Sequence, residues 1–233
     1  MTDETTTETE ETTDQAGALP PPTSDAPVMT KAVILGRKVG MLQHFRPDGS
    51  VVGATVIATE SNLVTRVATK ERDGYTAVQI GFGAIAEKKM SKGQRGHLGD
   101  LPPLRHLREV RVADVTGFAT GQRIGVESFA VGDKVHVTGI SKGKGFQGPV
   151  HLHHFTRGPK SHGSDHLRRQ GSVGSGTTPG RVLKGLRMAA HQGVDRVTVK
   201  NLEVLRADGE RSLLILAGAV PGPRNGVVMV KKA

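Results

Sequence analysis

The stretch VESFAVGDKVHVTGIS, residues 126–141, carries the clearest strand pattern in the chain and decides its fold. A Gly-Asp turn is followed by Val135, Val137 and Gly139 at alternating positions, with polar residues at the positions between the two valines and after them. This period of two is typical of a strand with one buried face. The stretch therefore predicts a sheet whose core lies on the side of the valines.

The strand pattern ends within this stretch, at about Gly139, and resumes only after a segment of 55 residues, 139–193. It resumes in RVTVKNLEVLRADGERSLLILAG, residues 196–218, as two strand runs around an Asp-Gly turn. A structureless segment of that length inside a compact domain is expected only when it is functional or binds a partner. Residues 139–193, called the arm below, are therefore the main candidate for function.

Upstream of residue 126 the chain is again rich in Val, Ile and Thr. Short strands and tight turns predict an antiparallel sheet or barrel. The upstream strand runs are 31–40, 50–60, 62–70, 75–83 and 107–114, with turns at 46–49 and 72–74. A last strand is expected near the C-terminus, in 225–232. Residues 83–106 interrupt this pattern with a polar, Gly- and Pro-rich insertion, where we expect a short helix over Ala84–Lys89 and otherwise loop.

Composition narrows the classes of function. The chain of 233 residues has no cysteine, which excludes disulfides, thiolate zinc sites and cysteine nucleophiles. No apolar run approaches the roughly 20 residues of a membrane span, and the N-terminus lacks a secretory signal, so a cytosolic protein is expected. One Tyr and six Phe, with no Trp, argue against a sheet surface on which bases stack.

Charge is distributed unevenly along the chain. Residues 1–28 hold seven acids and no Lys or Arg, and this coreless acidic segment is predicted to be disordered. The remaining residues carry 32 bases against 15 acids. A body with this charge is expected to bind a polyanion, and nucleic acid is the first candidate.

The arm concentrates the basic charge. Against one acid, Asp165, it holds nine bases: Lys142, Lys144, Arg157, Lys160, Arg168, Arg169, Arg181, Lys184 and Arg187. It also holds six of the ten His and twelve of the 31 Gly. Each cation that neutralises a phosphate releases a counterion, while glycine allows the backbone to approach phosphates and sugars closely. This composition predicts an RNA-binding segment that becomes ordered on RNA.

Enzyme-like motifs in the arm are weaker. Gly143-x-Gly145-x-x-Gly148 matches a dinucleotide fingerprint, but Pro149 and a later Gly-Pro leave no room for the helix that this motif opens. GSGTTPGRVLKG, residues 174–185, lacks the core of a phosphate-binding loop. The histidines near Asp165 lack the rigid frame of a zinc site, and no nucleophile elbow or pair of acids stands out. We therefore expect neither enzymatic activity nor a metal or other cofactor.

Several motifs in a fixed order now identify a resemblance. GRKVGM (36–41), GDKVHVTGISKGKGFQG (132–148), RGPKSHGS (157–164), GSVGSGTTPGRVLKGLRMA (171–189) and GAVPGPRNGVVMVKK (218–232) resemble bacterial large-subunit ribosomal protein L3, the uL3 family. The likeness covers residues 29–233, and residues 1–28 have no counterpart in the common family pattern.

The resemblance implies a mainly β fold. Residues 29–138 and 194–233 would form a closed six-stranded barrel like that of translation factors, with a small inserted subdomain of helix, strand and loop around 83–106. The arm would extend from the barrel, with its tip at about Gly171–Lys184. In the family, the globular part binds 23S rRNA near its 3′ end and helps nucleate subunit assembly, and the arm approaches the peptidyl transferase centre.

Partners and location follow from the same resemblance. Large-subunit rRNA and neighbouring ribosomal proteins such as L14 and L19 are the expected partners, in a cytoplasmic ribosome, with no membrane and no small-molecule substrate. Two other classes remain open at this point: a free-standing RNA-binding or RNA-chaperone module, and a barrel enzyme with the arm as a lid. A lid is expected to hold paired acids and less positive charge than this arm.

The predicted RNA-contacting residues are the nine bases of the arm together with six further side chains, Phe146, Gln147, His162, Ser172, Thr178 and His191. Phe146 has two possible roles, as a wedge against a base or as an anchor of the arm on the barrel. The scarcity of aromatic residues for the core favours the anchor.

Overall fold

The computed structural model describes residues 32–60 and 62–233, so the acidic segment 1–28 and its predicted disorder lie outside the described residues. The described chain is mainly strand. The strands are β1 (Val33–Phe45), β2 (Val51–Ala58), β3 (Asn62–Ala68), β4 (Ala77–Ala84), β5 (Leu104–Arg111), β6 (Arg123–Ile124), β7 (Lys134–Ile140), β8 (Phe146–Gln147), β9 (Ala190–His191), β10 (Arg196–Asp208), β11 (Leu213–Ala217) and β12 (Val227–Lys232).

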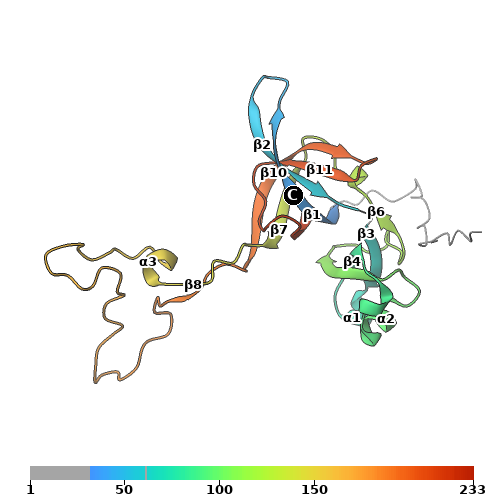
Figure 1. Cartoon of the computed structure of the whole chain (residues 1–233). Helices are drawn as coiled ribbons and strands as arrows, with labels where there is room; N and C mark the ends of the chain where they lie inside the picture. Colours follow the sequence, from blue (N-terminus) through green and yellow to red (C-terminus); the bar gives the residue numbers. More distant parts are fainter. Residues whose placement is uncertain (1–31, 61) are drawn as a thin grey trace, which may run out of the picture.

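Six of these strands close into an antiparallel barrel in the order β1-β12-β7-β10-β11-β2 (Figure 1). The strand predicted from residues 126–141 becomes β7, which lies between β12 and β10. Its alternation is reflected in burial, because Val135 and Val137 are fully buried whereas Lys134 is exposed. A mainly β fold with a ring of six strands is therefore confirmed.

A second, four-stranded sheet is inserted between β2 and β7, in the order β5-β4-β3-β6. Figure 1 shows this sheet beside the barrel, with the short helices at its far end. It takes strands from Asn62 to Ile124, so it is larger than the subdomain predicted around 83–106. Strand periodicity reveals individual strands but not which sheet each strand joins, which explains the difference.

The barrel and the inserted sheet share one hydrophobic core. Val33, Ile34 and Leu35 at the start of β1 are buried on both faces of the strand. They belong to one cluster of buried side chains that includes Val135 of β7 as well as Ile80 and Phe82 of β4. Because burial of apolar area stabilises at about 25 cal/mol per Å², this shared core fixes the inserted sheet against the barrel.

The side chain of Asn62 connects the two sheets at their junction. Its carboxamide accepts a hydrogen bond from the backbone N–H of Leu35 at 2.9 Å and donates to the Leu35 carbonyl at 2.9 Å. It also donates to the carbonyl of Thr59 at 2.9 Å. Strand β2 pairs with β1 only from Arg37 onward, so on that side Leu35 has no strand partner. The fully buried amide of Asn62 bonds the Leu35 backbone there instead.

The helices differ from the prediction. The expected helix over Ala84–Lys89 is only a 3-10 turn, η1 (Glu87–Lys89), and an α-helix, α2 (Lys92–Leu98), lies where loop was expected. Ser91 caps α2, because its hydroxyl accepts from the N–H of Gln94 at 3.3 Å and the Gln94 side chain accepts from the N–H of Ser91 at 3.4 Å. This Ser-x-x-Gln capping box was the available signal, and two glycines within the helix obscured it.

Three short elements complete the fold: α1 (Lys70–Asp73), η2 (Val126–Ser128) and α3 (Pro149–Leu152). The predicted turn at 46–49 is present, with the Gly49 N–H donating to the Arg46 carbonyl at 3.0 Å. In the part of the chain that the structure describes, no helix has the length and hydrophobicity needed to cross a membrane.

Candidate nucleic-acid interface

The arm leaves the barrel between β7 and β10 as two antiparallel limbs (Figure 1). Ladder pairing ends at Ile140 opposite Arg196, and backbone hydrogen bonds continue from Ser141 N–H to the Asp195 carbonyl at 2.9 Å and from Lys144 N–H to the Gln192 carbonyl at 2.8 Å. The two-residue strands β8 and β9 then pair through Phe146 and His191. The base of the arm is thus an extension of the barrel sheet.

Glycine is required at the arm base. Gly193 has φ of +85°, and a Cβ on it would lie 2.2 Å from the carbonyl oxygen of Lys142 on the opposite limb. That oxygen belongs to the backbone and cannot rotate away. Only glycine therefore allows the two limbs to approach this closely.

Beyond β8 and β9 a few contacts join the limbs. Helix α3 follows Gly148, and the His153 ring donates to the Met188 carbonyl at 2.9 Å. The ring of His151 lies 3.1 Å from the Gln192 side-chain oxygen, and the Gln170 amide donates to the Arg187 carbonyl at 2.6 Å. Within residues 141–195, all of which the structure describes, Pro149 alone is buried. The arm has no hydrophobic core of its own.

All nine bases predicted to contact RNA are exposed. Lys142 and Lys144 lie on the first limb near the barrel, Arg187 lies on the returning limb, and the others occupy the distal loops. Among the ion pairs of the described residues, none involves a base of the arm. The arm thus presents a series of exposed cations that no described carboxylate neutralises.

The remaining predicted residues are distributed over the whole arm. His162, Ser172 and Thr178 are exposed in the distal loops, and the Ser172 hydroxyl bonds the backbone of Gly174. The side-chain amide of Gln147 donates to the Lys144 carbonyl. The structure brings together Phe146 and His191 but spreads the other predicted contacts along the arm.

The role favoured for Phe146 was wrong. Its side chain is 66% exposed and does not anchor the arm in the barrel core. Its ring instead meets the edge of the His191 ring across the β8–β9 pair, at 5.5 Å between centroids and an interplanar angle of 81°. An exposed aromatic pair at this position is available to contact a base.

Metal and nucleotide sites have little support here. Among the described residues, no three His, Asp or Glu side chains are grouped so that they could hold a metal ion. The glycine motif ending at Gly148 is followed by α3, which is a single turn of four residues. A dinucleotide fingerprint would open a longer helix on a parallel sheet, whereas β7 and its neighbours are antiparallel.

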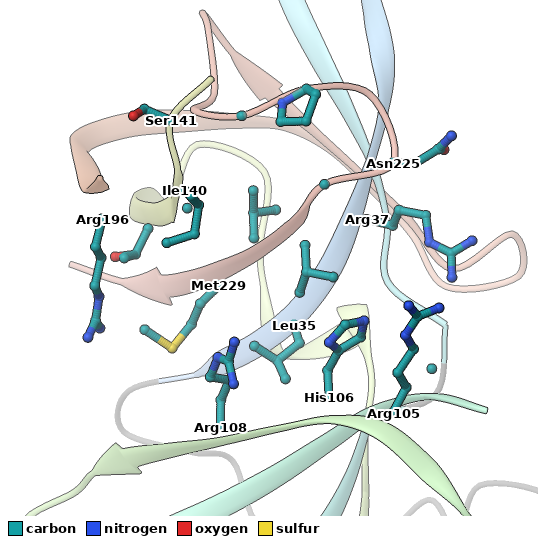
Figure 2. Close-up of a pocket in the computed structure, with 18 of the residues that line it drawn as sticks. Leu35, Arg37, Arg105, His106, Arg108, Ile140, Ser141, Arg196, Asn225 and Met229 are labelled. Atoms are coloured by element: carbon teal, nitrogen blue, oxygen red, sulfur yellow. The ribbon is translucent and has the colours of Figure 1, made fainter. Parts of the chain in front are cut away.

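Sequence reasoning missed a second group of cations, which lines a cleft of about 1110 Å³ between the barrel and the inserted sheet. Figure 2 shows Arg105, His106 and Arg108 rising from the inserted sheet, with Arg37 and Arg196 on the barrel side. Lys142 also lines this cleft. These residues lie far apart in the sequence, so only their separate positions were visible there.

Burial and neighbouring positive charge lower the pKa values of two side chains in and near the cleft. Burial first, and then the charges of Arg105, Arg108 and Arg37, hold the pKa of His106 below its ordinary value. Near the base of the arm, burial and then the charge of Lys142 lower the pKa of Lys38. The Lys38 ammonium donates to the Val220 carbonyl at 2.8 Å, which secures the loop before β12.

The barrel, the inserted sheet and the arm together define a small β-barrel protein whose longest irregular segment carries nine exposed cations. The chain belongs to the ribosomal protein L3 family, uL3. A family model described as ribosomal protein L3 matches residues 111–212. The relatives below match most of the chain, and the predicted family membership is confirmed.

Three relatives illustrate the similarity, and all three carry the name large ribosomal subunit protein uL3. The protein of Herpetosiphon aurantiacus is 49% identical over 202 residues, which are 86% of this chain and 95% of the relative. That of Synechococcus sp. (strain JA-3-3Ab) is 49% identical over 203 residues, with the same coverage. That of Bacillus mycoides is 48% identical over 207 residues, which are 88% of this chain and 98% of the relative.

Proposed function

We propose that the protein is a structural constituent of the large ribosomal subunit and acts by binding rRNA rather than by catalysis. Family membership and the names of the relatives support the large subunit. The observation that carries the mechanism is the arm, with nine exposed cations, no ion pair to a described acid and no hydrophobic core. Such a segment gains its counter-charge from RNA phosphates.

In this proposal the parts of the molecule have separate tasks. The globular part binds 23S rRNA near its 3′ end and helps nucleate subunit assembly. The arm extends toward the peptidyl transferase centre, with residues 171–184 at its tip. Its contacts are the residues predicted from the sequence, and L14 and L19 are the neighbouring proteins. The protein then acts in the cytoplasm as part of the ribosome.

The salt dependence of binding tests the electrostatic mechanism. We expect the affinity of the free protein for 23S rRNA to fall roughly tenfold or more between about 50 and 200 mM salt, because each phosphate contact releases a counterion. Filter-binding titrations at several salt concentrations measure this slope. A flat response would contradict an interface dominated by phosphate contacts.

Location in the cell tests the rest of the proposal. Mass spectrometry of purified large subunits, followed by protein–protein and protein–RNA crosslinking, should find the chain bound to 23S rRNA and next to L14 and L19. The small subunit from the same preparation is the control. Recovery of the chain only outside ribosomal particles would instead indicate a free-standing RNA chaperone.

A further inference from the structure

The cleft between the barrel and the inserted sheet has the chemistry of a second polyanion site. Its cationic side chains come from four places in the chain: Arg37 on β1, Arg105 and Arg108 on β5, Lys142 at the base of the arm, and Arg196 on β10. Among the described residues that line it, Glu109 is the one acid, and that carboxylate accepts from the Tyr75 hydroxyl at 2.9 Å and from the Gln79 amide at 3.2 Å. The cleft therefore carries a net positive charge.

Most of these cations have no carboxylate partner within residues 32–60 and 62–233. Arg37 lies 3.8 Å from Glu60, whereas Arg105, Arg108 and Arg196 form no ion pair with a described residue. Burial is the main cause of the lowered pKa of His106, and the three arginines that add to it come from both walls of the cleft. Several guanidinium groups that line one cleft and lack a described counter-charge favour an anionic ligand with several acceptor oxygens.

The shape of the cleft fits a chain better than a single ion. Gly222 and Gly226 line its barrel side and are half-buried, so backbone is accessible there to a passing ligand. A smaller hollow of about 460 Å³ shares Lys142 with the cleft and adds two cations, Lys38 and Lys144, and one acid, Asp195. Cations thus continue from β5 across the base of the arm and onto its first limb.

We propose that this cleft binds the sugar–phosphate backbone of RNA and that it forms one continuous track with the arm. The inference rests on the proposed function and adds to it a contact face on the globular part. Arginine suits this role because its planar donors match phosphate oxygens and cannot lose their charge at physiological pH. The backbone contacts hold the barrel in place on the RNA while the arm extends from it.

Matched charge variants of the full chain test the proposal. The cleft variant is Arg105→Gln, Arg108→Gln and Arg196→Gln. The surface control is Arg72→Gln, Lys88→Gln and Arg211→Gln, which removes the same charge from exposed residues that line neither hollow. The arm variant is Arg168→Gln, Arg169→Gln and Lys184→Gln. Circular dichroism and thermal melting confirm that each variant is folded.

The measured quantity is the slope of log K against log salt for binding to purified 23S rRNA. We expect the cleft and arm variants each to reduce the slope by about two to three units, on the order of one per lost phosphate contact. The surface control should change it by less than about one unit. A normal slope for the cleft variant with a reduced slope for the arm variant would overturn the cleft site alone. Normal slopes for both would overturn the proposed function as well.

Crosslinking of the unmodified protein provides a test that needs no substitution. Ultraviolet irradiation of purified large subunits, with mass spectrometry of the crosslinked peptides, should attach rRNA to peptides containing Arg105, Arg108 and Arg196. Crosslinks from these peptides to a neighbouring protein, with RNA only on the arm, would assign the cleft to a protein partner and refute the proposal.

Discussion

At the residue scale, the buried amide of Asn62 holds β1 at the junction between the barrel and the inserted sheet. Asn62 satisfies both backbone groups of Leu35 and a carbonyl of the connecting segment. Nothing in the sequence marks this asparagine, because Leu35, which it bonds twice, lies 27 residues away in β1. Buried polar groups that lose their partners cost far more than the net value of a hydrogen bond.

We expect Asn62→Ala to lower the free energy of unfolding by about 2–4 kcal/mol, because it leaves the N–H and carbonyl of Leu35 buried without partners. Asn62→Asp should also be destabilising, since a carboxylate cannot donate to the two carbonyls. Urea unfolding followed by circular dichroism measures both variants. A loss below about 0.5 kcal/mol for both would contradict this role.

His106 makes stability depend on pH. Its folded-state pKa lies below the ordinary value of 6.5, so the unfolded chain binds the proton more tightly. Stability is therefore lost as pH falls through about 6.5 and is retained above it. Between pH 7.5 and 5 the wild type should lose more unfolding free energy than His106→Gln, with the other histidines common to both. Equal losses would show that His106 titrates normally.

At the element scale, a hairpin of the barrel leads into the arm, and single backbone hydrogen bonds join the two limbs between the barrel ladder and the separate β8–β9 pair. β7 and β10 pair up to Ile140 and Arg196, and the limbs continue through β8 and β9. The strand character of 134–140 and 196–208 was readable from the sequence, and so was the break between them. The close approach of the limbs at Gly193 was not, because it depends on the opposite backbone.

We expect Gly193→Ala to force the limbs apart, with a local cost of about 1–3 kcal/mol from its positive φ and the contact with the Lys142 carbonyl. Hydrogen exchange at the amides of Lys144 and Gln192 should then become faster. Gly176→Ala is the matched control, because a Cβ there meets nothing within 4 Å. Unchanged exchange at the base of the arm would contradict the steric argument.

At the scale of the whole molecule, the hydrophobic core and the arm are separate. The core cluster belongs to the barrel and the inserted sheet, whereas the arm holds nine exposed cations. The globular part therefore does not depend on the arm for its core.

Replacing Lys142–Val194 with an Asn-Gly turn should leave a folded barrel, because Ser141 and Asp195 are already hydrogen bonded at 2.9 Å and suit a two-residue hairpin. Thermal unfolding and circular dichroism check the fold. The same variant should impair large-subunit assembly, which sucrose gradients of cells that depend on it would reveal as fewer mature subunits. A normal yield of active subunits would remove the role proposed for the arm.

Much of the candidate interface could be predicted because it is local in sequence. The nine arm bases lie within one Gly-rich segment that shows no strand or helix pattern, so their exposure could be expected from the sequence. The role of Phe146 and the helix α2 were predicted wrongly, each for its own reason. The aromatic residue was expected in a core that aliphatic side chains already fill, and the helix was hidden by its glycines despite its cap.

The sequence by itself determined where strands, turns and charge lie, because alternation, turn residues and composition act over a few neighbouring positions. Only the tertiary structure decided that β3 to β6 form a separate sheet, that Asn62 bonds the backbone of β1, and that arginines from β1, β5 and β10 converge on one cleft. The physical reason is that these features depend on pairing and packing between segments far apart in the chain. The periodicity of one segment does not indicate which other segment it will pair or pack with.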